Sequence, residues 1–270
     1  MFRFLLTPRW LGLLAAVLVV GLTCMELGSW QWRRYADRQA SNESIQANLA
    51  SPEVPVDQVM TTTRGVAESV EWTRVEATGR YDDAHEVIVL YRTRDGAPGV
   101  DVVLPLVTAS GTALLVDRGW IATTANGNSR PEVPPPPPGE VTITGWVRRN
   151  AADDPQQVTP SDGYVRAISS DGIASTLPYD VYDGFVDLQE EQPTVSPAPA
   201  VADPPDLGSG PSFFYGLQWY FFGLLAFAFW LYFAWAEYRQ KSAGGGADLP
   251  GDREGHPGAV VRDGGTVIRD

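Results

Sequence analysis

The stretch GPSFFYGLQWYFFGLLAFAFWLYFAWAEYRQ, residues 210–240, decides the class of this protein. Thirteen of the 23 residues at positions 213–235 are Phe, Tyr or Trp, and the first charge in the stretch is Glu237. An uncharged apolar run of this length crosses about 30 Å of hydrocarbon as a helix. We therefore predict a transmembrane helix over residues 212–236. Leu and Ala alone would make such a span, so the excess of rings needs its own explanation.

A second apolar run, WLGLLAAVLVVGLTCMEL at residues 10–27, has one charge, Glu26, near its end. A cleaved signal peptide is the alternative to a span here, because Arg3 and Arg9 precede the run. No small-x-small cleavage site follows it, and Trp30 and Trp32 are typical of interfacial anchors. We predict an uncleaved first span.

The charges that flank the second span indicate its orientation. Asp203 and Asp206 precede it, whereas Arg239 and Lys241 follow it. Because cytoplasmic flanks carry the excess of basic residues, we predict a two-pass protein of the cell membrane with both termini in the cytoplasm and a large extracytoplasmic loop. The predicted segments outside the spans are a cytoplasmic N-terminus at 1–9, a helix extension at the outer surface at 28–50, a β domain at 51–190, a Pro-rich linker at 191–211 and a disordered cytoplasmic tail at 237–270.

The loop alternates apolar and polar residues with period two, and it is rich in β-branched side chains. This pattern predicts strands at 74–81, 86–91, 100–108, 112–121 and 140–148, with two more at 163–169 and 182–190. The proline run at 131–140 predicts a stiff extended connector. The fold class is therefore an α+β membrane protein, in which two transmembrane helices flank a mainly antiparallel β domain, either a small open barrel or a sandwich.

Composition excludes several classes of function. The formal net charge is −13, which argues against a nucleic-acid partner. The single cysteine, Cys24, excludes a disulfide or a cysteine-based zinc site within the chain. The loop has one histidine, His85, no GxSxG elbow and no glycine-rich phosphate loop. We predict no catalytic residue, no metal site and no enzyme activity, which leaves a binding or scaffolding protein.

The segment VDRGW contains Arg118, Gly119 and Trp120. We interpret it as the end of a strand, where Gly119 permits a tight bend. An arginine beside an indole would suit an amphiphile that has carboxylates and a flat ring system. A structural salt bridge at the strand end is the alternative.

Taken together, several motifs resemble a known family. They are LGSWQWRR at 27–34, GRYDDAHEVIVLYRTRDGAPGVDVVLPL at 79–106, LLVDRGWI at 114–121, VTITGWVR at 141–148 and YGLQWYFFGLL at 215–225. In this order they are similar to the Surfeit locus protein one family of cytochrome c oxidase assembly factors. The family's usual Asn before Arg-Gly is Asp117 here, and its usual Lys four residues after the Arg at position 34 is Arg38.

The resemblance implies a chaperone that assists maturation of subunit one of the haem-copper oxidase, with haem A insertion as the step concerned. It implies as partners subunit one, other membrane subunits of respiratory complexes and the lipid bilayer. A stable accessory subunit of an oxidase complex or supercomplex is the alternative, and an enzyme of haem modification is a third hypothesis. Some bacterial members associate with haem A through a His before the second span. That position is Ser212 here, so the resemblance leaves open only transient haem A contact without an intramembrane histidine ligand.

We expect partner or haem contacts from residues that the motifs place near the outer membrane surface or in the VDRGW segment. Trp30, Gln31 and Arg34 are predicted to meet Tyr215 and Trp219 at one membrane interface. The alternative for the tryptophans is simple interfacial anchoring. The candidate contact residues are Trp30, Gln31, Arg34, Arg118, Gly119, Trp120, Tyr215 and Trp219.

Overall fold

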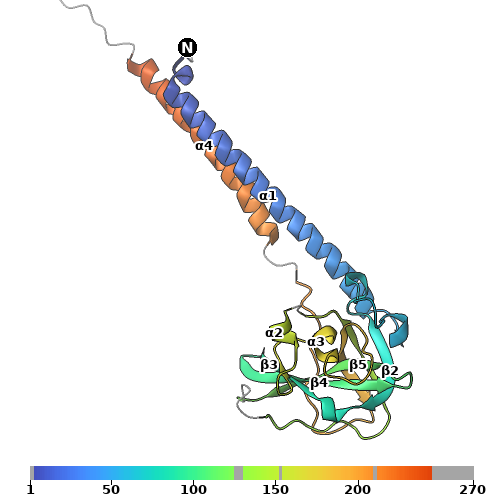
Figure 1. Ribbon diagram of the computed structural model, residues 1–270. Coiled ribbons are helices and arrows are strands. Elements are labelled where there is room, and N and C mark those ends of the chain that lie inside the picture. Colours follow the sequence, from blue (N-terminus) through green and yellow to red (C-terminus); the bar gives the residue numbers. More distant parts are fainter. Residues whose placement is uncertain (1–2, 125–129, 152–153, 209–211, 245–270) are drawn as a thin grey trace, which may run out of the picture. The chain divides into compact units, whose positions relative to one another are not determined.

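The computed structural model describes residues 3–124, 130–151, 154–208 and 212–244 (Figure 1). It divides into two compact units. The helix unit comprises Met1–Trp32 with Pro211–Asp270, and the barrel unit comprises Arg33–Gly210. Each unit is described separately.

The helix unit contains a short 3-10 helix, η1 (Arg3–Leu6), and two long helices, α1 (Pro8–Leu49) and α4 (Ser212–Gly244). Within this unit, the N-terminal part of α1 and α4 run side by side (Figure 1). Both helices are long and apolar enough to cross a membrane. The two predicted spans are therefore confirmed as helices. The structure also confirms that α1 continues as a helix through residues 28–49, because no proline interrupts it.

Among the residues that the structure describes, the barrel unit has eight strands. Their bounds are β1 Val54–Pro55, β2 Arg74–Tyr81, β3 Val87–Arg94, β4 Ala97–Thr108, β5 Ala113–Ala122, β6 Val141–Arg148, β7 Tyr164–Val165 and β8 Phe185–Gln192. Short helical segments join them: η2 Val56–Gln58, η3 Glu68–Val70, η4 Asp83–His85, α2 Pro155–Val158 and α3 Ser170–Ala174. Five predicted strands are thus present, with bounds shifted by up to three residues.

Five of the strands form a closed ring of pairings, in the order β2, β6, β8, β5, β4 and back to β2. The closing pair is antiparallel and joins Gly79–Tyr81 of β2 to Leu106–Thr108 of β4. Within the ring only β5 and β8 run parallel. The domain is therefore mainly antiparallel, as predicted, but the barrel is closed rather than open. Closure removes two exposed strand edges.

The barrel interior is filled by alternate residues of its strands. They include Val75 and Ala77 of β2, Leu114 and Val116 of β5, Val141 and Ile143 of β6, and Val186 and Leu188 of β8. The opposite face of β3, β4 and β5 buries a second apolar cluster against α3, centred on Val89, Val103, Leu115 and Ile173. Successive residues of these strands therefore point alternately into the two clusters, because both faces of this part of the sheet are covered.

Four local expectations need correction. The tail predicted to be disordered from residue 237 begins as helix, because α4 runs to Gly244, and residues 245–270 lie outside the described part of the chain. The strand predicted at 163–169 is only Tyr164–Val165, because the chain turns into α3 at Ser170. The strand predicted at 182–190 begins at Phe185, after a glycine with positive φ at Gly184. The linker at 191–211 does not leave the domain directly. Gln192 still belongs to β8, and Ala200 makes a β-bridge with Trp120.

Candidate functional site

The two helices of the helix unit meet along a seam of small residues. The less exposed positions of α1 include Trp10, Leu14, Val17, Gly21, Cys24, Gly28 and Gln31, and those of α4 include Gly216, Trp219, Gly223, Ala226, Trp230, Ala234 and Glu237. Spacings of three and four residues are the repeat of left-handed helix pairs. A Cβ built at Gly223 would lie 3.3 Å from the Cβ of Cys24, so this glycine lets the backbones approach closely.

At the N-terminal end of α4, the seam brings together part of the predicted interface. A Cβ built at Gly216 would lie 3.1 Å from Trp32 and 3.6 Å from the Cβ of Gln31. The ring of Trp32 packs edge-on against Phe213, with centroids 5.2 Å apart. Gln31 therefore lies beside the residue that follows Tyr215. The prediction missed Trp32 as a contact of α4, although the seam spacing would have pointed to it.

The other predicted contacts of this unit lie around the seam. Trp219 is half-buried, with its ring edge-on to Phe222 at 6.1 Å. Tyr215 and Trp30 are 49% and 47% exposed. Arg34, which belongs to the barrel unit, is also exposed. Whether these side chains contact a partner stays a prediction.

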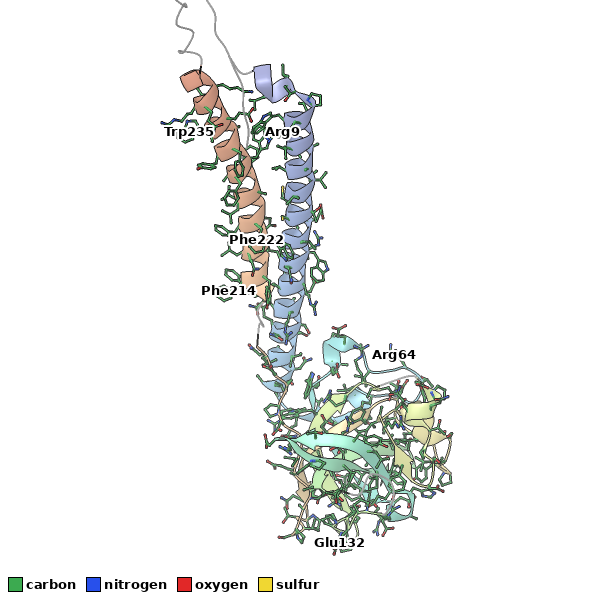
Figure 2. The ribbon with its side chains drawn as sticks, turned by 90° about the vertical axis from the view of Figure 1, so that its left-hand side faces the viewer. Arg9, Arg64, Glu132, Phe214, Phe222 and Trp235 are labelled. Atoms are coloured by element: carbon green, nitrogen blue, oxygen red, sulfur yellow. The ribbon has the colours of Figure 1, made fainter. Side chains whose placement is uncertain are left out.

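Aromatic rings cover most of the exposed surface of α4. Of the thirteen rings at 213–235, all but Trp219 and Trp230 are exposed. Phe214, Phe222 and Trp235 mark this aromatic surface at the start, middle and end of the helix (Figure 2). The helix pair thus exposes a large aromatic area, which is suited to packing against other rings or apolar groups.

In the barrel unit, Arg118 is fully buried and forms an ion pair. Its Nη2 lies 2.9 Å from Oε1 of Glu191, and its Nη1 donates to the carbonyl oxygen of Pro134 at 3.1 Å. Tyr81 donates its hydroxyl to Glu191 at 3.2 Å, and burial together with the Glu191 charge raises the pKa of Tyr81. The guanidinium is thus satisfied inside the protein. This geometry favours the structural salt bridge that the sequence left open, with Glu191 as the partner.

Gly119 and Trp120 lie within β5, so the expectation that the strand ends at Arg118 is wrong. The strand instead contains a bulge, since Gly119 pairs with Val102 and Asp117 pairs with Val103. Gly119 has a φ of +123°, and a Cβ there would overlap the carbonyl oxygen of Ala200. A glycine is needed at this point because the 200–203 segment crosses directly over the bulge.

This crossing segment is held to the barrel by side chains. Arg94 donates to the carbonyl oxygens of Ala200 and Val201, and it pairs with Asp203 at 2.5 Å. Gln189 donates to the carbonyl oxygen of Ala202 at 3.3 Å. Trp120 exchanges two backbone hydrogen bonds with Ala200, both at 2.8 Å. We name residues 192–203 the strap.

The sequence analysis did not predict an acidic cluster at the bulge, formed by the buried Asp117 and Asp187 and the half-buried Asp101. Asp117 accepts a hydrogen bond from the Gly119 N–H at 3.0 Å. Burial raises the pKa of Asp117 well above its usual range, and the charges of Asp101 and Asp187 raise it further. Arg148 Nη1 lies 2.5 Å from Asp187. Arg92 Nε lies 2.7 Å from Asp101 as an ion pair, although the angle is poor for a hydrogen bond.

Of the two histidines, only His85 lies in the part of the chain that the structure describes. His85 is paired with Asp82 at 2.7 Å, and Tyr179 donates to the same carboxylate at 2.8 Å. His256 lies outside the described residues, and of Ser212 only the helical backbone is described. Among the described residues, no group of three His, Cys, Asp or Glu side chains is placed to hold a metal ion.

Comparison with known proteins agrees with the resemblance found in the motifs. The model of the SURF1 family, the Surfeit locus protein one family, matches residues 18–224. Uncharacterised SURF1-like proteins of Mycobacterium tuberculosis and Mycobacterium bovis are each 31% identical over 258 residues, which is 93% of this chain and 92% of theirs. A SURF1-like protein of Rickettsia felis is 29% identical over 39% of this chain and 45% of its own length.

Proposed function

Because the chain belongs to the SURF1 family, we propose that it is an assembly factor for the haem-copper cytochrome c oxidase. The observation that supports this proposal most strongly is that the family match extends from the first apolar helix, through the barrel, into the second. The family is known for oxidase assembly, and its members act generally without catalysis. We infer that this chain is likewise a chaperone and not an enzyme.

We propose that both apolar helices cross the cell membrane and that the barrel unit lies on its extracytoplasmic side. The charges that flank α4 support this orientation, since Asp203 and Asp206 precede it and Arg239 and Lys241 follow it. Such a topology would put the rings of α4 at the depth of the membrane helices of oxidase subunit one. Aromatic rings are suited to packing against a neighbouring helix.

We propose that the surface that meets subunit one and other membrane subunits is the aromatic surface of α4, together with Trp30, Gln31, Arg34 and Tyr215. The seam supports this assignment, because small residues join α1 to α4 and eleven of the thirteen rings stay exposed. Arg118 and Gly119 fit a different, structural role. Arg118 pairs with Glu191 inside the barrel unit, and Gly119 leaves room for the strap at Ala200.

We propose assistance at the haem A insertion step without an iron ligand from α4. Ser212 occupies the position of the suggested histidine, and serine is a poor axial ligand compared with imidazole. A transient porphyrin contact would then rest on ring packing alone. A visible absorption spectrum of the purified protein from cells that make haem A tests this step; a Soret band that disappears in His85→Ala would contradict it.

The experiment that tests the assembly role is quantitative co-purification in a mild detergent. An assembly factor is expected to be recovered with immature subunit one and to be depleted from mature oxidase. Recovery at a fixed ratio to mature, active oxidase would refute the proposal and would support the alternative, a stable accessory subunit.

A further inference from the structure

A groove lies between the first turns of α1 and the last turns of α4, both within the helix unit. Its volume is about 530 Å³, which is in the usual range of small-molecule sites. Leu13 and Val17 of α1 and Ala226, Phe229 and Phe233 of α4 form apolar walls. Arg9, Leu13 and Val17 follow one another at four-residue spacing, so the wall runs for about 12 Å along the helix.

The mouth of the groove carries a positive charge. Arg9, Glu237 and Gln240 line it, and Lys241 follows Gln240 on α4. Glu237 pairs with Lys241 at 2.9 Å and accepts the Trp10 N–H at 3.1 Å. Two cations, Arg9 and Lys241, and the carboxylate of Glu237 leave a net charge of about +1 at the mouth. Figure 2 shows Arg9 near the same end of the pair as Trp235.

An unpaired donor lies in the wall of the groove. Trp230 lines it, and its indole N–H is buried with no hydrogen-bond partner among the described residues. The Trp230 ring packs edge-on against Trp10, with centroids 6.1 Å apart. Trp10 also donates its N–H to Glu237 at the mouth. The Trp10 ring therefore connects Trp230 to the charged residues of the mouth. In a bilayer no water would satisfy this donor at low cost, so a bound acceptor would stabilise it.

We propose that this groove binds one anionic phospholipid, with its phosphate at Arg9, an ester carbonyl near the Trp230 N–H and an acyl chain along Leu13, Val17 and Phe229. The cation, the N–H donor and the apolar walls follow one another along the helices. The phosphate, the ester carbonyl and the acyl chain follow one another in the same order along a phospholipid. The net positive mouth selects an anionic headgroup over a zwitterionic one. The inference goes beyond oxidase assembly and requires only that the helix pair lies in a membrane.

The test uses the full chain, purified in mild detergent and examined by native mass spectrometry. Phosphatidylglycerol and phosphatidylcholine with identical acyl chains are added in equal amounts. We expect about tenfold more protein to carry phosphatidylglycerol, as one charge-assisted hydrogen bond would give. Arg9→Gln is expected to reduce this preference to less than about twofold.

Trp230→Phe provides an independent variant, because it keeps the ring and removes only the N–H. It is expected to lower occupancy by both lipids about threefold while the preference for the anionic one persists. Arg33→Gln and Trp235→Phe are matched controls, since neither residue lines the groove, and both should behave as the parent.

Several outcomes would overturn the proposal. Equal occupancy by the two lipids in the parent chain would show that headgroup charge plays no part. An unchanged preference in Arg9→Gln, or an unchanged occupancy in Trp230→Phe, would place the lipid elsewhere. Displacement of phosphatidylglycerol by inorganic phosphate alone would show that the site binds free phosphate and not a lipid.

Discussion

Replacement of Arg118 by Leu tests whether the VDRGW segment is structural. The Arg118 side chain is 0% exposed and that of Glu191 is 8% exposed, so the change leaves a buried carboxylate without its counter-ion. Loss of one partner of such a pair typically costs about 3–5 kcal/mol. For a domain the size of the barrel unit, about 2–4 °C of melting temperature is lost per kcal/mol, which predicts a fall of about 6–20 °C.

A double variant tests whether the cost comes from the unpaired charge of Glu191 and not from the loss of the Arg118 side chain. Arg118→Met combined with Glu191→Leu removes both charges and fills similar space, so stability should return to within about 2 kcal/mol of the parent. Arg130→Leu serves as a control, because the Arg130 side chain is 51% exposed and its pairing with Glu86 should contribute no more than about 1 kcal/mol.

The assay is thermal unfolding of the full chain in detergent, followed by tryptophan fluorescence, in parallel with oxidase abundance in cells. We expect oxidase abundance to follow the abundance of each variant, so that the double variant recovers both. If Arg118→Leu melted within about 2 °C of the parent, the buried ion pair would not be a major stabilising contact. If oxidase were lost while the protein stayed stable, Arg118 would act on a partner instead.

Three further predictions concern single residues. Gly119→Ala should destabilise the barrel unit by more than about 2 kcal/mol, because the new Cβ would overlap the Ala200 carbonyl and the φ of this residue is +123°. Denaturant unfolding measures the cost. Gly111→Ala is the control, since a Cβ there meets no other atom, and an equal cost for the two variants would contradict the prediction. Asp117→Asn should raise the melting temperature more at pH 8 than at pH 5. The pKa of Asp117 is raised in the folded state, so the parent loses stability as pH rises towards that value, by about 1.4 kcal/mol per pKa unit, and Asn removes this loss; a difference that does not vary with pH would show that the carboxyl does not titrate. Arg34→Ala, at an exposed position, should lower oxidase abundance more than it lowers the abundance of the chain itself, measured by quantitative blotting, and the reverse order would assign Arg34 a structural role.

Local patterns predicted the elements of the fold well. The two long helices followed from uncharged apolar length, and strands such as β2 at Arg74–Tyr81 followed from alternation. Barrel closure could not be predicted in the same way. It depends on three residue pairs between β2 and β4, which are set by strand curvature and not by any local signal.

Side-chain contacts between residues far apart in the sequence could not be predicted either. The motifs identified Arg118 and Gly119, but nothing in the sequence identified Glu191 as the partner, 73 positions away. The acidic cluster likewise brings together Asp101, Asp117 and Asp187 from β4, β5 and β8. Proline-rich composition predicted a free linker at 191–211, whereas the strap is held by Arg94 and Trp120. Composition reports on backbone stiffness and says little about tertiary contacts.

The central claim is that this chain serves oxidase assembly, and the ratio of haem A to subunit one polypeptide in membranes tests it most directly. The ratio is measured in cells that lack the chain and again after the chain is restored. We predict that the ratio and the amount of mature oxidase fall together on deletion and recover on restoration. An unchanged ratio with unchanged oxidase abundance would contradict the account.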